Sequence, residues 1–253
     1  MTVDVIVLAG ARNNGPLSMA SDAAYEAEIE IAGHPMVWYV LKALREIAAI
    51  ERIVVVGPVQ QLSEHSREMG CEIVEGGKSM VESLENGLTA IGNSSAVLVT
   101  TCDIPLITAQ ALEDFLKRCD EREAELYYSV VSRDDNDKAY PEVQRTYVRL
   151  RDGVFTGGNV VLVKRPEMVG ELKTILNQAV AFRKQPVKMC RLLGLSFLVK
   201  LIAGKLTIAE IENRVRKMLH LDGACIISPY PEIGIDVDKP SDLELAKKVL
   251  NSN

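Results

Sequence analysis

The chain has 253 residues, of which 47% are hydrophobic and 25% are charged, and this is the composition of an ordinary globular protein. Its net charge of -6 argues against nonspecific nucleic-acid binding by the chain as a whole. Five cysteines form no CxxC motif or Cys/His cluster, and their odd number favours reduced thiols over a disulfide framework. No positive segment precedes the first apolar run, and no stretch reaches the roughly 18 apolar residues of a membrane span. A cytoplasmic location is therefore expected.

Strands and helices alternate through the first half of the chain. Nearly unbroken apolar runs predict buried strands at 3–10, 52–58, 71–77 and 96–105. Apolar residues at helical spacing predict helices at 35–50, 79–92 and 108–119. This order predicts a three-layer, Rossmann-like α/β fold with a mostly parallel sheet. Ligands bind beyond the carboxyl ends of such strands, so Gly10, Gly76, Gly77 and Asp103 are expected on one rim.

The second half of the chain has a different pattern. We expect a strand at 125–131, a polar loop at 133–141, and a hairpin around Asp152-Gly153 within 146–164. Residues from about 165 to 222 are predicted to form a helical insert in a single domain spanning 1–253. Residues 164–223 carry seven lysines and five arginines against five acidic residues, a net charge of +7, and the remainder carries -13.

Three aspartates are candidate metal ligands. Asp103 follows a buried strand, where a hard cation such as Mg²⁺ could be held by a carboxylate, phosphate oxygens and water. An Asx turn before Pro105 is the alternative interpretation. Asp236 and Asp238 lie two residues apart, so on an extended segment both face the same side. The alternative for Asp238 is that it caps the helix that begins near Pro240.

Segments rich in small residues follow two of the predicted strands, and a third leads into a strand. Residues 9–15 could present backbone N–H groups to phosphates, and the Gly76-Gly77-Lys78-Ser79 junction could admit a base or a phosphate, with Ser79 or Ser83 as hydrogen-bonding groups. The junction lacks the upstream glycine of a P-loop. Gly157 and Gly158 either form a bulge or line an acceptor pocket together with Asn159.

Six stretches, taken in order, resemble the nucleotidyltransferase superfamily with the GT-A type of α/β fold, and most closely its molybdenum-cofactor guanylyltransferase-like (MobA-like) branch. They are "VIVLAGA", "IAGHPMVWYVLKAL", "GGKSMVESLENGL", "VLVTTCDIPLIT", "FTGGNVVLV" and "DVDKPSDLELA". They extend over residues 3–250 apart from the basic helical segment. The resemblance implies transfer of a nucleoside monophosphate from a nucleoside triphosphate to a phosphorylated or hydroxylated small-molecule acceptor, with release of pyrophosphate.

The resemblance also implies roles for individual residues. Mg²⁺ is expected on Asp103, Asp236 and Asp238, where it would polarise the α-phosphate during in-line attack. The residues expected to bind nucleotide are Leu8, Ala9, Gly10, Ala11, Gly15, Gly76, Gly77 and Ser83. The residues expected to act in catalysis are Asp103, Arg12 and Lys78. The residues expected to bind the acceptor are Gly157, Gly158 and Asn159.

Two cationic positions of the family pattern are changed in this chain. Gly15 stands where the first loop of the family has an arginine, and Glu26 stands where the family has a lysine. Arg12 and Lys78 are the candidate substitutes. These changes leave two alternatives open, namely a nucleotide-binding or regulatory protein of the same fold without turnover, and a glycosyltransferase-like enzyme that uses a nucleotide sugar.

The stretch 187–206 in the basic segment is apolar with spaced cations. It could rest on an anionic membrane surface or hold a lipid-linked acceptor. The alternative that we favour is a helical lid or a contact between copies in a homo-oligomer.

Overall fold

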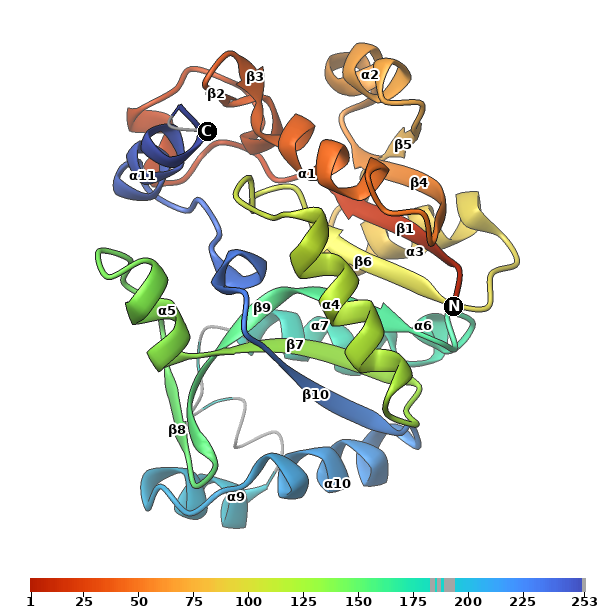
Figure 1. Ribbon diagram of the computed structural model, residues 1–253. Helices are drawn as coiled ribbons and strands as arrows, with labels where there is room; N and C mark the ends of the chain where they lie inside the picture. Colours follow the sequence, from red (N-terminus) through yellow and green to blue (C-terminus); the bar gives the residue numbers. More distant parts are fainter. Residues whose placement is uncertain (183–184, 186–187, 189–193, 252–253) are drawn as a thin grey trace.

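The computed structural model describes residues 1–182, 185, 188 and 194–251. An eight-stranded sheet, with β8 paired to β9 beside the main path, lies at the centre in the order β10-β7-β9-β6-β1-β4-β5 (Figure 1). The strands are β1 (Val3–Leu8), β4 (Ile50–Gly57), β5 (Glu72–Glu75), β6 (Val97–Thr101), β7 (Leu126–Ser132), β8 (Val148–Leu150), β9 (Gly153–Val163) and β10 (Gly223–Ser228). The predicted α/β fold with a mostly parallel sheet is confirmed.

Helices lie on both faces of the sheet (Figure 1). They are α1 (Met36–Arg45), α2 (Val59–Glu68), α3 (Met80–Ile91), α4 (Ala109–Asp120), α5 (Arg133–Ala139), α6 (Met168–Glu171), α7 (Lys173–Phe182), α9 (Leu195–Ile202), α10 (Ile208–Leu219) and α11 (Pro240–Leu250). A two-stranded ribbon of β2 (Glu30–Ile31) and β3 (His34–Pro35) precedes α1. Helix α3 packs on β1 and β4, and α4 packs against α1 and β10, so the layers form around the central strands.

The sheet changes direction at β9. Strand β1 pairs in parallel with β4 and β6, whereas β9 runs antiparallel to both β6 and β7. Strand β10 then adds in parallel to β7 at the edge. The carboxyl ends of β1, β4, β5 and β6 therefore share one rim, as predicted.

Local sequence signals explain where several helices begin and end. The Ser79 and Thr108 side chains accept hydrogen bonds from Glu82 N and Ala111 N, at 3.1 and 3.2 Å, and so cap α3 and α4. Gly92 ends α3 with a φ of +71°, a conformation that glycine adopts without steric cost. The predicted capping box of Thr207 with Glu210 starts α10.

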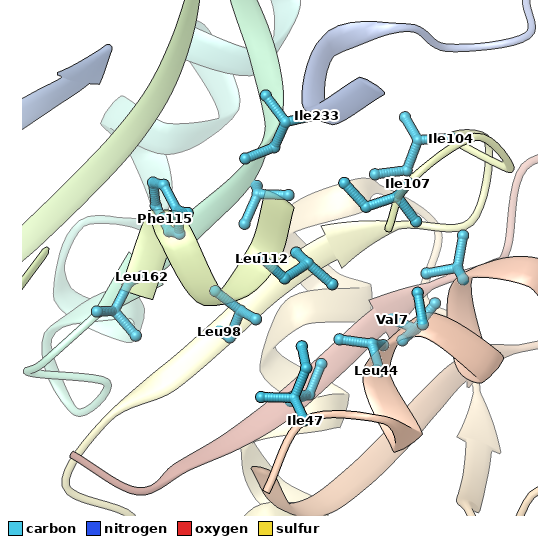
Figure 2. Close-up of a cluster of buried hydrophobic side chains, with 14 of the residues drawn as sticks. Val7, Leu44, Ile47, Leu98, Ile104, Ile107, Leu112, Phe115, Leu162 and Ile233 are labelled. Carbon is cyan, nitrogen blue, oxygen red and sulfur yellow. The ribbon is translucent and has the colours of Figure 1, made fainter. Parts of the chain in front are cut away.

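The largest core lies between the sheet and the α1–α4 layer. Figure 2 shows Val7 and Leu98 from the central strands meeting Leu44 of α1 and Phe115 of α4. Each of these four side chains is fully buried. Burying a side chain of this size contributes about 1.5–3 kcal/mol. This core fixes the strands whose ends carry the candidate site.

Two predictions about local structure were wrong, and one strand was missed. Residues 133–139 of the expected polar loop form α5, because Ser132 caps it by accepting from Asp135 N at 3.0 Å. The helix expected at 35–50 ends at Arg45, and Pro35 is its N-cap rather than part of its first turn. Strand β10 was not predicted at all.

Four helices, α6, α7, α9 and α10, occupy described parts of the segment predicted to be helical. Residues 183–184, 186–187 and 189–193, which include part of the stretch 187–206, lie outside the described residues. On α9, Val199 and Ile202 are exposed. Among the described residues, no helix combines the length and apolar character needed to cross a membrane. Contact with a membrane surface stays a prediction, as does the domain division.

Candidate functional site

The three predicted metal-ligand aspartates come together at the rim of the sheet. Asp103 lies just beyond β6, and Asp236 and Asp238 lie between the 3₁₀ turn Pro231–Gly234 and α11. One carboxylate oxygen from each residue lies within 4.8 Å of the others. A backbone hydrogen bond of 2.8 Å from Val237 N to Asp103 O joins the two segments. Residues more than 130 positions apart in the chain therefore share one cluster, which we call the aspartate triad.

Side chains alternate between two sides of the extended segment 235–238, and this alternation brings Asp236 and Asp238 to the same side as Asp103. Ile235 and Val237 are buried in a core cluster with Leu243 of α11, whereas Asp236 and Asp238 face the opposite side. Lys239, rather than Asp238, is the N-cap residue of α11. The Asp242 side chain accepts a 3.2 Å hydrogen bond from Asp238 N.

A buried arginine that the sequence analysis did not identify contacts the triad. The guanidinium of Arg145 forms an ion pair and hydrogen bond with Asp236, and both side chains are largely buried, at 14% and 11% exposed. Burial lowers the pKa of Arg145 from its usual value, and the charges of Asp238, Asp242 and Asp103 act in the opposite direction. The residue remains a fixed positive charge at neutral pH.

Asp103 lies in a region that carries negative charge. Thr101 Oγ1 donates a hydrogen bond to the Asp103 carboxylate. The pKa of the neighbouring Cys102 thiol lies well above its usual value because of burial, with further contributions from the charges of Asp103 and Glu26. Glu26, which stands at the family's lysine position, is thus close enough to add negative charge to this region. The donor set of clustered, partly solvent-accessible carboxylates fits a hard divalent cation such as Mg²⁺.

A second group of residues on the rim consists of small residues from three strand ends. A Cβ atom added at Gly76 would lie 3.7 Å from Gly57 Cα, 3.7 Å from Ser83 Oγ and 3.9 Å from Gly10 Cα. Ser83 Oγ accepts a 2.9 Å hydrogen bond from Gly77 N. The structure therefore brings Gly10, Gly76, Gly77 and Ser83 together, as predicted. We call these four residues with Gly57 the glycine floor.

Gly57 was not predicted as a site residue. A Cβ atom there would lie 2.8 Å from Ala9 O, which is closer than a real side chain can approach. The absence of a side chain allows the backbones that follow β1 and β4 to touch. Its position at the end of a strand, next to Pro58, was the available signal.

The loop after β1 is held by its own hydrogen bonds. Asn13 is buried, and its Nδ2 donates to Ser21 O and Ala23 O at 2.8 and 3.0 Å. Ala9 N donates to Val56 O, and Glu26 N donates to Ala11 O. Asn13 thus fixes the loop, which leads from Leu8 at the end of β1 to Gly15 at the start of a 3₁₀ turn.

The predicted catalytic cations are both exposed. The Arg12 guanidinium lies 4.8 Å from the centre of the Tyr25 ring, so it packs on an aromatic face beside the loop. Lys78 lies between the glycine floor and α3, and its backbone N donates to Glu82 Oε2 at 2.9 Å. Their catalytic roles stay predictions.

The predicted acceptor residues lie on β9. Cβ atoms at Gly157 and Gly158 would collide with the Tyr128 and Ser129 side chains of β7. A register shift between Tyr128 and Val130 lies opposite, which agrees with the bulge interpretation. A Cβ atom added at Gly234 would lie 3.3 Å from Gly157 O, so this part of β9 adjoins the turn before Asp236. Asn159 Nδ2 is buried without a hydrogen-bond partner. Acceptor binding there stays a prediction.

Comparison with known proteins identifies the family. The model of the MobA-like NTP transferase domain matches residues 6–193. A hypothetical transferase from Thermus thermophilus is 33% identical with a TM-score of 0.81, and the match covers 96% of this chain and 100% of that one. Molybdopterin-guanine dinucleotide biosynthesis protein A from Archaeoglobus fulgidus shares the fold at 12% identity, with a TM-score of 0.56 and coverage of 99% and 100%.

A curated relative matches a shorter stretch. The 2-C-methyl-D-erythritol 4-phosphate cytidylyltransferase of Clostridium perfringens is 32% identical over 96 residues, which cover 35% of this chain and 43% of that protein. The matched stretch thus spans less than half of the curated relative. The family match itself extends over most of the present chain, from Ile6 within β1, and includes the glycine floor, Asp103 and the β8–β9 hairpin. The chain is a member of the MobA-like NTP transferase domain family, a family of nucleotidyltransferases.

Proposed function

We propose that this protein transfers a nucleoside monophosphate from a nucleoside triphosphate to a phosphorylated or hydroxylated small-molecule acceptor, releases pyrophosphate, and requires Mg²⁺. The observation that carries the proposal is the aspartate triad, whose carboxylate oxygens lie within 4.8 Å of one another on the same rim of the sheet as the glycine floor. The family match and the named cytidylyltransferase relatives support this reaction class.

The two groups of rim residues have separate tasks in this proposal. The glycine floor lets the base and ribose approach the backbone, and Gly10 and Ala11 offer N–H groups to the phosphates. Asp103, Asp236 and Asp238 hold Mg²⁺. When bound, Mg²⁺ supplies charge neutralisation and polarisation at the α-phosphate.

The proposed step is an in-line displacement at the α-phosphorus. An acceptor oxygen forms a bond to that phosphorus as the bond to the bridging oxygen breaks, the leaving group is pyrophosphate, and the proton of a hydroxyl acceptor passes to solvent. Such a reaction depends on alignment and charge more than on a protein nucleophile. The strand β9 residues Gly157–Asn159, next to the turn that leads to Asp236, would hold the acceptor on the opposite side from the glycine floor.

One observation favours a second candidate, a nucleotide-binding protein of this fold without turnover. Glu26 places negative charge near Cys102 and Asp103, where the family pattern has a lysine. A carboxylate there opposes binding of a triphosphate. The two candidates differ in chemistry rather than in fold, so a turnover assay separates them.

The experiment begins with a thermal-shift screen of the four nucleoside triphosphates and of nucleotide sugars, each with and without Mg²⁺, because a ligand that binds the folded state raises the Tm. Pyrophosphate release is then measured with a panel of sugar phosphates and polyols. We expect a Tm increase that depends on Mg²⁺ and pyrophosphate release with at least one acceptor. Binding without release would support the second candidate, and a Tm increase with nucleotide sugars alone would point to a glycosyltransferase-like enzyme.

A further inference from the structure

Arg145 places a positive charge at the aspartate triad, where the proposed divalent cation would also bind. Its guanidinium pairs with Asp236, one of the three aspartates whose oxygens cluster within 4.8 Å. The side chain is 14% exposed, so solvent screens the pair weakly. Three carboxylates brought together would repel one another without a cation. The guanidinium is therefore a resident positive charge that stabilises the triad in the metal-free protein.

The segment that carries Arg145 is attached to the body on both sides. The Tyr140 hydroxyl donates to Glu232 Oε1 at 2.8 Å, which ties the beginning of the segment to the turn just before Asp236. At its other end, the Arg133 guanidinium of α5 lies 5.4 Å from the centre of the Tyr147 ring. The position of Arg145 is thus built into the fold rather than set by a chance surface contact.

We propose that Arg145 is a built-in competitor of the divalent cation at the aspartate triad, and this proposal rests on the proposed function. A guanidinium in contact with Asp236 and a cation on the same carboxylates repel each other. Metal binding must therefore displace Arg145 from Asp236 or proceed against its charge, and in both cases Arg145 weakens metal affinity. By linkage, metal binding weakens the Arg145–Asp236 pair to the same degree.

A positioning role for Arg145 predicts the opposite result. If the guanidinium only oriented Asp236 by hydrogen bonding, its loss would weaken metal binding, as happens when groups that orient a metal ligand are removed. The sign of the change in metal affinity therefore decides between competition and positioning.

The test measures Mn²⁺ binding to the full chain by calorimetry and by electron paramagnetic resonance, without nucleotide, so it does not depend on turnover. The variants are Arg145→Met, which removes charge and hydrogen bonds, Arg145→Gln, which removes charge, and Arg145→Lys, which retains it. We expect both neutral variants to bind Mn²⁺ more tightly than the unmodified protein, by at least about tenfold, and Arg145→Lys to stay within a fewfold of it.

Arg151→Gln is the matched control, because Arg151 is exposed in the β8–β9 turn, and its Mn²⁺ affinity should not change. In EDTA, the neutral variants should also melt at lower temperature, and Mn²⁺ should raise their Tm more than that of the unmodified protein. If Arg145→Met does not fold in EDTA, Arg145→Gln and Arg145→Lys carry the comparison.

The outcomes distinguish the inference from the proposed function. Equal or weaker Mn²⁺ binding by the neutral variants, with binding by the unmodified protein intact, overturns competition and leaves the metal site standing. No binding by the unmodified protein together with binding by Arg145→Gln supports competition. No Mn²⁺ binding by any form overturns the metal site and the inference with it.

Discussion

The aspartate triad and the glycine floor lie on the same rim of the sheet and are built in opposite ways. The floor consists of small residues at the ends of β1, β4 and β5 together with Ser83 of α3, and it works through backbone proximity. The triad consists of charged side chains from two distant segments, with Arg145 from a third. The glycine floor depends on shape and the aspartate triad on electrostatics. Substitutions in the two groups should therefore impair the protein in different ways.

The largest expected effect is on the triad. Asp103→Asn removes one of the charged side chains that we propose bind Mg²⁺, with little change in shape, and we expect pyrophosphate release to fall on the order of a thousandfold. The thermal midpoint without metal should not fall, because the variant removes one of three carboxylates that repel one another. Asp120→Asn, at the exposed end of α4, is the matched control and should retain full activity. Full activity of Asp103→Asn would contradict the proposed chemistry.

The glycine floor should respond to added volume. Gly57→Ala places a methyl group 2.8 Å from Ala9 O and pushes the backbones after β1 and β4 apart. A displacement of this kind can cost on the order of a hundredfold in rate, and nucleotide affinity measured by calorimetry should fall. Gly170→Ala is the control, because a Cβ atom there meets nothing within 4 Å. Unchanged nucleotide binding by Gly57→Ala would show that the glycine floor does not take part in binding the nucleotide.

The hydrogen bonds of Asn13 in the loop after β1 should affect the stability of the fold. Asn13→Ala removes the two hydrogen bonds that hold the loop after β1. We expect the free energy of unfolding, measured by urea denaturation, to fall by about 1–3 kcal/mol. Asn14→Ala, an exposed neighbour, is the control. A loss of nucleotide affinity larger than the loss of stability would indicate that Asn13 shapes the loop for its ligand.

Glu26 offers the smallest and most specific test. Glu26→Lys restores the charge that the family pattern has at this position and should tighten binding of a nucleoside triphosphate with Mg²⁺ by about fivefold. Glu30→Lys, which makes the same charge change at an exposed position on β2, is the control. Equal effects of the two variants would show that only overall charge matters.

The same contrast explains how much of the molecule could be predicted from the sequence. The glycine floor belongs to consecutive parallel strands, so its residues gather as soon as the strand order is known. Asp103, Asp236 and Asp238 were expected to meet, and they do. Their meeting followed from the family resemblance, because spacing alone does not place residues that are more than 130 positions apart.

The missed features depend on tertiary context. Arg145 lies between α5 and β8 in an irregular segment with no motif, and only the folded chain brings it to Asp236. Strand β10 lies at the sheet edge, and its place there depends on pairing with β7, which is almost 100 positions away in the chain. Helix α5 was missed because its polar composition resembles that of a loop, although Ser132 provides a cap.

The backbone hydrogen bond from Val237 N to Asp103 O has a consequence for synthesis. A ribosome completes β1, β4, β5 and β6, with the glycine floor and Asp103, long before Asp236 and Asp238 emerge. The nascent polypeptide can thus form the glycine floor, to which we assign nucleotide binding under the proposed function, while it still lacks two of the three carboxylates. Under the proposed function, the cation site is complete only in the final stage of translation, so a product that ends before Asp236 should lack the proposed transfer activity even where its early strands have folded.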